Sequence, residues 1–218
     1  MAVTLKKGQG VSLRKEENDL SSVTIGLGWD VAEEKKGFLG SLFGAKTEDY
    51  DLDAIAFLLG PEGNIQYFGT DSDGKPSIAG GDIVFYNSLK HPSGAIWLTG
   101  DNRTGAGDGD DEQIIVKLEN LAAHYERIVF LVSIYQGKSK GQNFGKIRNA
   151  YIRAVDAKNR EICRYNISGD ISFSNYCALT FAEFIRNGSG WTFNAIGTPH
   201  ETDNLRELIN PYLFTSNK

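Results

Sequence analysis

The sequence predicts a mainly β protein, a two-sheet antiparallel β-sandwich with a few short peripheral α-helices. Strand-like segments recur along the whole chain, and glycine, which suits tight turns, accounts for 25 of the 218 residues. These strands do not alternate regularly with long helices, as a doubly wound parallel sheet requires. Antiparallel strands that pack as two sheets explain the pattern better.

The expected strands are short runs that are rich in β-branched and aromatic residues. One of them, Arg127–Tyr135, is almost continuously apolar, which is typical of a central strand that is buried on both faces. The other expected strands are Ala2–Leu5, Val11–Arg14, Ser22–Gly28, Ala54–Gly60, Ile65–Phe68, Ile83–Tyr86, Ala95–Thr99, Gln113–Leu118, Ala150–Asp156, Glu161–Asn166 and Trp191–Ile196.

Helical signals are fewer. The clearest predicted helix runs from Ser174, which is suited to cap its N-terminus, to Arg186, because apolar residues recur there at helical spacing. These apolar residues are Cys177, Phe181, Phe184 and Ile185. A terminal helix is expected over Thr202–Leu213, and one or two helical turns over Asn120–Glu126.

The chain is expected to form one sandwich domain over residues 1–197, with a helical tail over residues 198–218 that packs on the same domain. Two stretches resemble surface insertions, near residues 33–48 and 69–81. In the first, the apolar run Phe38–Phe43 follows two lysines, which suggests a contact with a protein partner or a membrane surface. A loop that folds back on the core is the alternative.

Charge and composition narrow the function. The formal net charge of −5 argues against general nucleic-acid binding. No apolar run approaches the ~18 residues of a membrane span, and the first residues do not resemble a signal peptide. A cytoplasmic location is therefore expected, with peripheral membrane contact left open. Cys163 and Cys177 are expected to be reduced residues of the core.

An acidic, glycine-rich segment, Gly100–Glu112, carries the strongest functional signal. Its carboxylates repel one another unless solvent or a cation neutralises them. It also offers the Asn102 amide and Thr104 hydroxyl oxygens, and its glycines allow backbone carbonyls to turn inward. Calcium takes about 6–8 oxygen ligands in an adaptable geometry, so the segment predicts a calcium site, with a solvated acidic turn as the alternative. The carboxylates are Asp101, Asp108, Asp110, Asp111 and Glu112.

Carboxylates at other strand ends extend the expected site. Asp51 and Asp53 point to the same side of an extended backbone, and Asp30 follows another strand. If these strand ends converge on the acidic segment, the carboxylates suffice for two calcium ions. An EF-hand is excluded because Gln113 stands where a loop beginning at Asp108 requires glycine. Zinc is disfavoured because the cluster has no Cys or His, whereas magnesium remains an alternative.

No catalytic set is recognisable. The three histidines, His91, His124 and His200, are scattered and are expected to be surface or structural residues. The basic run Lys138–Arg148 offers a contact for an anionic partner, with a solvated hairpin loop as the alternative.

The motifs Gly26–Asp30, Asp51–Ala54, Phe85–Asn87 and Gly100–Glu112 resemble those of the TerD family of tellurium-resistance and stress-response proteins. The resemblance spans residues 1–197 and implies a β-sandwich with peripheral helices. It also implies two calcium ions near the acidic segment, and an association with tellurite resistance and with phage or toxin tolerance in bacteria. No catalytic mechanism is carried over. The candidate metal ligands are Asp30, Asp51, Asp53, Asp101, Asn102, Thr104, Asp108, Asp110 and Glu112.

These observations lead to the hypothesis of a calcium-binding, non-enzymatic module. Calcium would order a surface that protein partners of a stress-response complex recognise. The alternatives are a structural scaffold stapled by calcium, and an enzyme that acts on a nucleotide or on tellurite.

Overall fold

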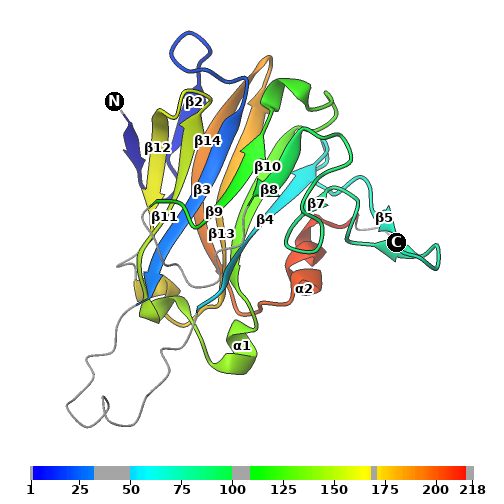
Figure 1. Cartoon of the computed structure of the whole chain (residues 1–218), viewed down its shortest axis with the longest axis vertical. Helices are drawn as coiled ribbons and strands as arrows, with labels where there is room; N and C mark the ends of the chain where they lie inside the picture. The colour runs from blue at the N-terminus through cyan, green and yellow to red at the C-terminus, as the bar shows by residue number, and fades with distance from the viewer. Residues whose placement is uncertain (1, 32–49, 100–108, 168–170, 215–218) are drawn as a thin grey trace.

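The computed structural model describes residues 2–31, 50–99, 109–167 and 171–214 and confirms a sandwich of two six-stranded sheets (Figure 1). The order of the first sheet is β1 (Val3–Leu5), β12 (Glu161–Asn166), β11 (Ile147–Asp156), β3 (Val23–Val31), β9 (Glu112–Val116) and β8 (Ile96–Thr99). The order of the second sheet is β2 (Gly10–Leu13), β14 (Gly190–His200), β13 (Ala178–Asn187), β10 (Arg127–Ile134), β4 (Leu52–Leu59) and β7 (Ile83–Val84).

Nearly all neighbouring strands are antiparallel, and only β1 and β12 pair in parallel among the described strands. Helical elements are short. They are α1 (Gly137–Lys140), α2 (Leu205–Ile209) and the 3-10 turns η1 (Leu118–Asn120), η2 (Phe144–Lys146), η3 (Ile171–Phe173) and η4 (Asn210–Tyr212). In the part of the chain that the structure describes, no helix has the length and apolar character needed to cross a bilayer.

The second sheet is covered on both faces. Every residue of β4 is buried, because its side chains alternate between two apolar clusters. Leu52, Ala56 and Leu58 join the main core between the sheets. Phe57 and its neighbours on the outer face join a second cluster that is closed by Leu208 and Ile209 of α2. The short terminal helix therefore completes the burial of the central strands, on the right of the molecule in Figure 1.

The helix predicted over Ser174–Arg186 is wrong, because most of this segment, from Ala178 onward, forms strand β13. Consecutive residues Phe130 and Leu131 of β10 pair with Ala182 and Thr180, so Phe181 is the extra residue of a β-bulge against β10. The register with β14 shifts at the same place. The bulge breaks the two-residue alternation and places Phe181 and Phe184 in the same core at a spacing of three. That spacing imitates a helix in the sequence.

The strand predicted over Ile65–Phe68 is also wrong, apart from one isolated bridge at Ile65. The backbone N–H groups of Gln66 and Tyr67 donate instead to Oδ2 of Asp82, at 3.0 and 2.8 Å. The other carboxylate oxygen of Asp82 accepts a hydrogen bond from the Tyr125 hydroxyl at 2.6 Å and lies 3.1 Å from Nε2 of His91. A buried carboxylate thus takes the donors that a strand ladder would use.

The other expected elements lie near their predicted positions. The terminal helix is present as α2 followed by η4, and the helical turn expected over Asn120–Glu126 lies slightly earlier, at η1. Strand β14 continues to His200, across the expected boundary at residue 197. The stretch 69–81 contains a hairpin of β5 (Gly69–Thr70) and β6 (Pro76–Ser77), whereas residues 33–48 lie outside the described residues. Cys163 and Cys177 are both buried and free.

Replacing Phe184 tests the assignment of β13 to the core. Its fully buried ring packs edge-to-face against Phe130 and Phe193, at centroid distances of 5.3 and 5.6 Å. We expect Phe184→Ala to lower the free energy of unfolding by about 3–5 kcal/mol in urea denaturation, because it leaves a cavity. The control Phe214→Ala removes a ring that is 57% exposed, and its effect should stay within about 0.5 kcal/mol. Equal effects of the two substitutions would place Phe184 outside the core.

The turn between β11 and β12 is held by a buried carboxylate. Oδ1 of Asp156 accepts the backbone N–H groups of Lys158 and Arg160, both at 2.9 Å. Oδ2 accepts the Asp19 N–H at 3.1 Å and lies 2.6 Å from Nη2 of Arg160. Burial opposes ionisation, but these hydrogen bonds outweigh it and lower the pKa of Asp156 to about 2.

Because the pKa of Asp156 is lowered in the folded state, the free energy of unfolding depends on pH in the acidic range. The unfolded state binds a proton at the ordinary pKa of about 3.9, before the folded state does. The stabilisation is therefore complete above about pH 4 and is lost as the pH falls through about 2. We expect Asp156→Asn to lower the free energy of unfolding near neutral pH and to flatten its decline between about pH 4 and 2, measured by urea denaturation. If the free energy of unfolding of the variant declined just as steeply between about pH 4 and 2, Asp156 would not be the cause of that decline.

Candidate functional site

Three strand ends that bear carboxylates meet at one end of the sandwich. The end of β3 pairs with the start of β9, where Leu27 lies opposite Glu112 and its carbonyl accepts the Asp111 N–H at 2.8 Å. The start of β4 joins them, because the Ala54 N–H donates to Oε2 of Glu112. The structure therefore brings together the segments that contain Asp30, Asp53 and Glu112.

Glu112 lies between the two sheets. It is only 2% exposed, and it shares the inward side of β9 with the core residues Ile114 and Val116. Its carboxylate connects β9 of the first sheet to β4 of the second through the Ala54 N–H. The backbone donor thus holds this buried carboxylate in a fixed position at this end of the molecule.

Asp53 faces a different side. Its neighbours Leu52 and Ala54 belong to the main core, whereas Asp53 borders a cavity on the outer face of the second sheet, beside Ile55. Its side chain is buried, with 7% exposure. Asp51 precedes β4 and is half-buried, and its carbonyl accepts the Tyr135 N–H at 2.7 Å. Asp53 belongs to β4, and Glu112 accepts the N–H of Ala54 in the same strand. The two carboxylates therefore lie on opposite sides of β4.

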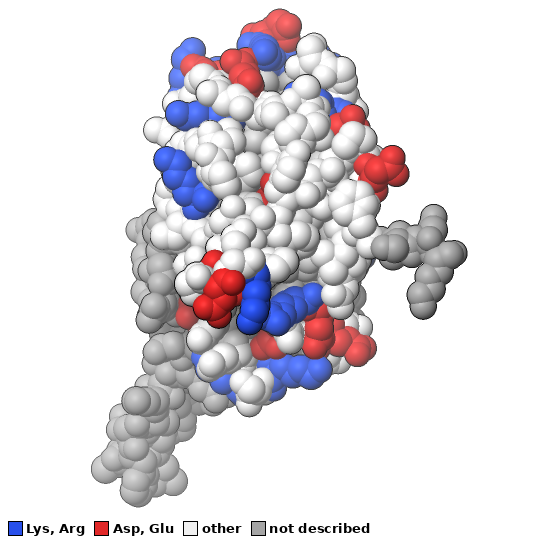
Figure 2. All heavy atoms as spheres, turned by 90° about the vertical axis from the view of Figure 1, so that its right-hand side faces the viewer, with Lys and Arg blue, Asp and Glu red and all other residues white. Residues whose placement is uncertain are grey.

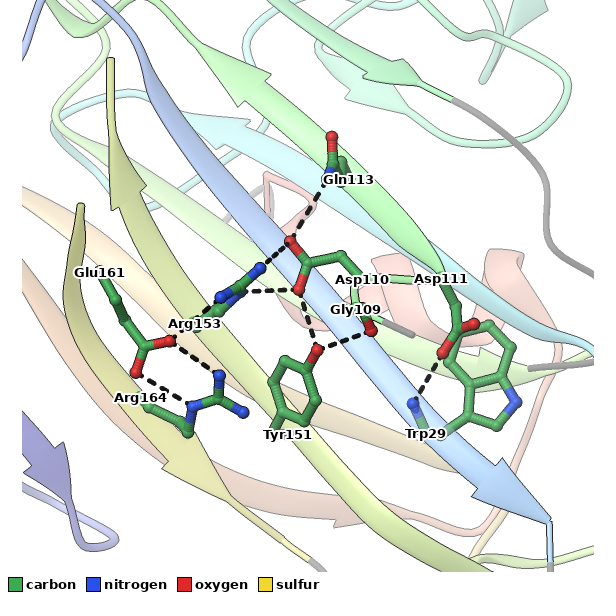
Figure 3. A network of polar contacts seen from close by, with 9 residues as sticks. All are labelled: Trp29, Gly109, Asp110, Asp111, Gln113, Tyr151, Arg153, Glu161 and Arg164. Atoms are coloured by element: carbon green, nitrogen blue, oxygen red, sulfur yellow. Dashed lines mark hydrogen bonds and ion pairs between the residues drawn. The ribbon is translucent and has the colours of Figure 1, made fainter. Parts of the chain in front are cut away.

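Asp110 is held by a network on the outer face of the first sheet, shown in Figure 3. Arg153 makes a two-pronged ion pair with it, with Nε 2.7 Å from Oδ1 and Nη2 3.1 Å from Oδ2. The Gln113 amide donates to Oδ2 at 3.3 Å. The Tyr151 hydroxyl lies 3.1 Å from Oδ1 and 2.7 Å from the Gly109 carbonyl. Both carboxylate oxygens are engaged by the protein itself.

The network extends to one further strand, β12, in Figure 3. Glu161 accepts hydrogen bonds from Arg153 at 3.2 Å and from Arg164 at 2.7 Å, and the hydrogen bond from Arg164 is the main cause of its lowered pKa. The Arg164 guanidinium lies 3.9 Å from the centre of the Tyr151 ring. Burial, followed by the nearby Asp110 charge, raises the pKa of Tyr151 to about 12, so its hydroxyl remains a donor at neutral pH.

Two glycines make room for this network. A Cβ atom at Gly26 would lie 2.1 Å from Oδ2 of Asp110, and one at Gly28 would lie 2.5 Å from the Tyr151 ring. Neither distance is compatible with a side chain. The Gly26–Asp30 motif therefore allows Asp110 and Tyr151 to lie directly on β3.

Asp111 and Asp30 have separate contacts. Oδ2 of Asp111 accepts the Trp29 N–H at 2.9 Å, which fastens the start of β9 to the end of β3. Asp30 is exposed, and its Oδ2 accepts a hydrogen bond from the Asn149 side chain at 2.6 Å. Asp111 was absent from the predicted ligands, and so were the groups that bind Asp110. For Tyr151 and Arg153, which bind Asp110, the sequence signal is that these polar residues alternate with apolar ones along the predicted strand Ala150–Asp156.

The remaining predicted ligands, Asp101, Asn102, Thr104 and Asp108, lie outside the described residues. Within the described ranges, no three or more His, Cys, Asp or Glu side chains form a group able to hold a metal ion. The described part of the chain thus supplies acidic strand ends and their supports, but not a complete metal site. The apolar run Phe38–Phe43 also lies outside these ranges and stays a prediction.

The fold and the site define a class of protein, a β-sandwich in which acidic strand ends meet at one end of the two sheets. The TerD domain matches residues 1–212, and the chain therefore belongs to the TerD family. This agrees with the resemblance in the sequence motifs and places the protein among tellurium-resistance and stress-response relatives.

Relatives and a solved structure agree with this assignment. The chain is 58% identical over 213 residues to the tellurium resistance protein TerX of Serratia marcescens, which covers 98% of this chain and 100% of that protein. It is 35% identical over 214 residues to the stress response protein SCP2 of Bacillus subtilis (strain 168), with the same coverage. A crystal structure of a TerD homologue from Streptomyces coelicolor A3(2) has the same fold, with a TM-score of 0.61 and 21% identity over 85% of this chain and 94% of that one.

The ion pair between Arg153 and Asp110 can be tested by substitution. The Asp110 side chain is only 2% exposed, so removing its guanidinium partner leaves a nearly buried charge. We expect Arg153→Met to lower the free energy of unfolding by about 1–3 kcal/mol in urea denaturation. Arg14→Met is the matched control, because Arg14 pairs with Glu17 while 66% exposed and should contribute less than about 1 kcal/mol. Equal effects of both substitutions would contradict a supporting role for Arg153.

Proposed function

We propose that this protein is a calcium-binding, non-enzymatic module of the tellurite-resistance and stress-response type. Two calcium ions bind through the acidic segment Gly100–Glu112 together with carboxylates from neighbouring strand ends. The bound ions order a surface that protein partners recognise. The observation that carries the proposal is the meeting of the β3, β4 and β9 ends around the buried Glu112 carboxylate.

The chemistry of the donors supports calcium over softer metals. The segment and the strand ends offer carboxylate, amide, hydroxyl and carbonyl oxygens, which hard cations prefer, and contain neither Cys nor His. The ligands proposed for the ions are Asp30, Asp51, Asp53, Asp101, Asn102, Thr104, Asp108, Asp110 and Glu112. Calcium tolerates an irregular shell, whereas magnesium demands a near-octahedral one, so a long glycine-rich segment favours calcium.

Asp110 has a special position in this proposal. Its two oxygens already bind Arg153, Tyr151 and Gln113, so it coordinates a cation only by sharing an oxygen with these groups. The guanidinium also compensates part of the negative charge that would otherwise attract a cation. Arg153 and Asp110 therefore hold the end of the acidic segment against β3, and the segment's other oxygens do most of the binding.

A thermal melt tests calcium binding. We expect calcium to raise the melting temperature more than magnesium does, and calorimetry to show saturable binding. At a free concentration a hundredfold above the dissociation constant, the stabilisation should be about 2.7 kcal/mol. The double variant Asp101→Asn/Asp108→Asn should lose this response, because both substitutions remove a charged ligand.

The matched control lies in another acidic glycine turn, Asp71–Gly74. Asp71→Asn/Asp73→Asn removes the same charge from exposed positions that are far from Glu112 along the chain, and it should leave the calcium response unchanged. The proposal is rejected if calcium neither binds nor stabilises the protein, or if both double variants lose the response equally.

Partner capture separates a binding module from a scaffold that is merely stapled by calcium. The full chain is immobilised on a resin and incubated with bacterial lysate. We expect it to retain specific proteins in the presence of calcium and to release them when a chelator is added. The Asp101→Asn/Asp108→Asn variant should retain none under either condition. Identical capture with and without calcium would favour the scaffold instead.

A further inference from the structure

A cavity of about 500 Å³ lies between the outer face of the second sheet and the segment that carries α2. Such a volume is typical of small-molecule sites. Its walls come from β4, β10, the loops around residues 77–79 and 85–87, and residues 203–206. Figure 2 shows the face of the molecule on this side: charged side chains of both signs lie next to one another in its lower part, and uncharged groups cover its middle.

The floor of the cavity is acidic. Asp53 on β4 lies directly opposite Ser133 on β10, and both side chains are buried, with 7% and 4% exposure. A second carboxylate, Asp203, lines the cavity from the segment before α2 and is half-buried. Among the described residues that line the cavity, Arg206 is the only basic side chain, and it is exposed. Two partly or fully buried carboxylates against one exposed guanidinium make the interior favourable for a cation.

Two tyrosines stand at the wall next to Asp53. The rings of Tyr86 and Tyr135 meet edge-to-face, with centroids 6.0 Å apart. The Lys140 ammonium already lies 5.2 Å from the centre of the Tyr135 ring. These rings thus have the electrostatic character that attracts organic cations.

We propose that this cavity binds an organic cation, an ammonium or guanidinium group on a short apolar stem. The charge lies against Asp53 and Asp203 and beside the tyrosine rings. The stem packs on the apolar part of the lining, formed by Ile55, Phe85 and Leu205. An anion fits this site poorly, because it meets two carboxylates. Organic-cation binding goes beyond the proposed function, and the two share one carboxylate, because Asp53 is also among the proposed calcium ligands.

Four probes of similar size and different charge test the proposal. Butylguanidinium, butylammonium, butyrate and butanol are titrated into the full chain, and amide shifts are followed by two-dimensional NMR. We expect the two cations to bind saturably and to shift residues of the cavity lining, and butyrate and butanol to leave them unchanged. Saturable binding of butyrate, or the absence of saturable binding by both cations, overturns the proposal.

Substitutions then locate the charge. Asp203→Asn should weaken butylguanidinium binding about tenfold, which corresponds to about 1.4 kcal/mol. It retains an oxygen that can accept the Lys138 N–H, which lies 3.1 Å from Asp203, so the fold is preserved. Arg206→Gln should strengthen binding, because it removes the opposing positive charge. Glu207→Gln is the matched control, since this exposed residue of α2 lies outside the lining and should have no effect.

The aromatic wall and the calcium site are tested separately. Tyr135→Leu should weaken butylguanidinium binding several-fold, whereas Tyr135→Phe should retain it, because the ring and not the hydroxyl attracts the cation. The Asp101→Asn/Asp108→Asn variant should bind butylguanidinium as the unsubstituted protein does. If butylguanidinium bound both the Asp203→Asn and the Tyr135→Leu variants with unchanged affinity, its site would lie elsewhere and the assignment to this cavity would be overturned.

Discussion

The structure depends on the burial of both faces of the second sheet. Its central strands β4, β10 and β13 contribute one set of side chains to the core between the sheets and another to the cluster under α2. Burial of this much apolar surface is the main favourable term in folding. It also requires the short C-terminal helix to stay in place, although five residues form no stable helix on their own. The segment after β14 is therefore part of the core and closes its outer side.

The same constraint gives the buried carboxylates their importance. Asp53, Asp82, Glu112 and Asp156 are all nearly inaccessible to solvent, and burying a charge is costly unless it receives hydrogen bonds. Asp82 and Asp156 receive backbone donors that shape a loop and a turn, and Glu112 receives one that connects the two sheets. Negative charge thus has a structural use in several places besides the end where calcium binding is proposed.

Arg153 compensates part of the negative charge of the acidic segment, because its guanidinium pairs with Asp110. Counting carboxylates in the sequence suggests uncompensated repulsion, but in the structure the Arg153 guanidinium of β11 compensates the Asp110 charge, and the Tyr151 hydroxyl of the same strand hydrogen-bonds to it. Gly26 and Gly28 permit this contact because they leave the surface of β3 bare. The protein itself thereby fixes the end of the segment, and a pre-organised end lowers the ordering cost of the metal site proposed above.

The sequence alone determined the class of fold, most strand positions, the terminal helix and the concentration of oxygen donors near residues 100–112. These features are local, because alternation, turn residues and composition are read within a few positions. Only the tertiary structure decided that Ala178–Asn187 is a strand, that Gln66 and Tyr67 serve Asp82, and that Asp110 belongs to Arg153. The physical reason is that a β-bulge, a buried carboxylate and an ion pair each depend on partners far away in the chain, and no local pattern specifies them.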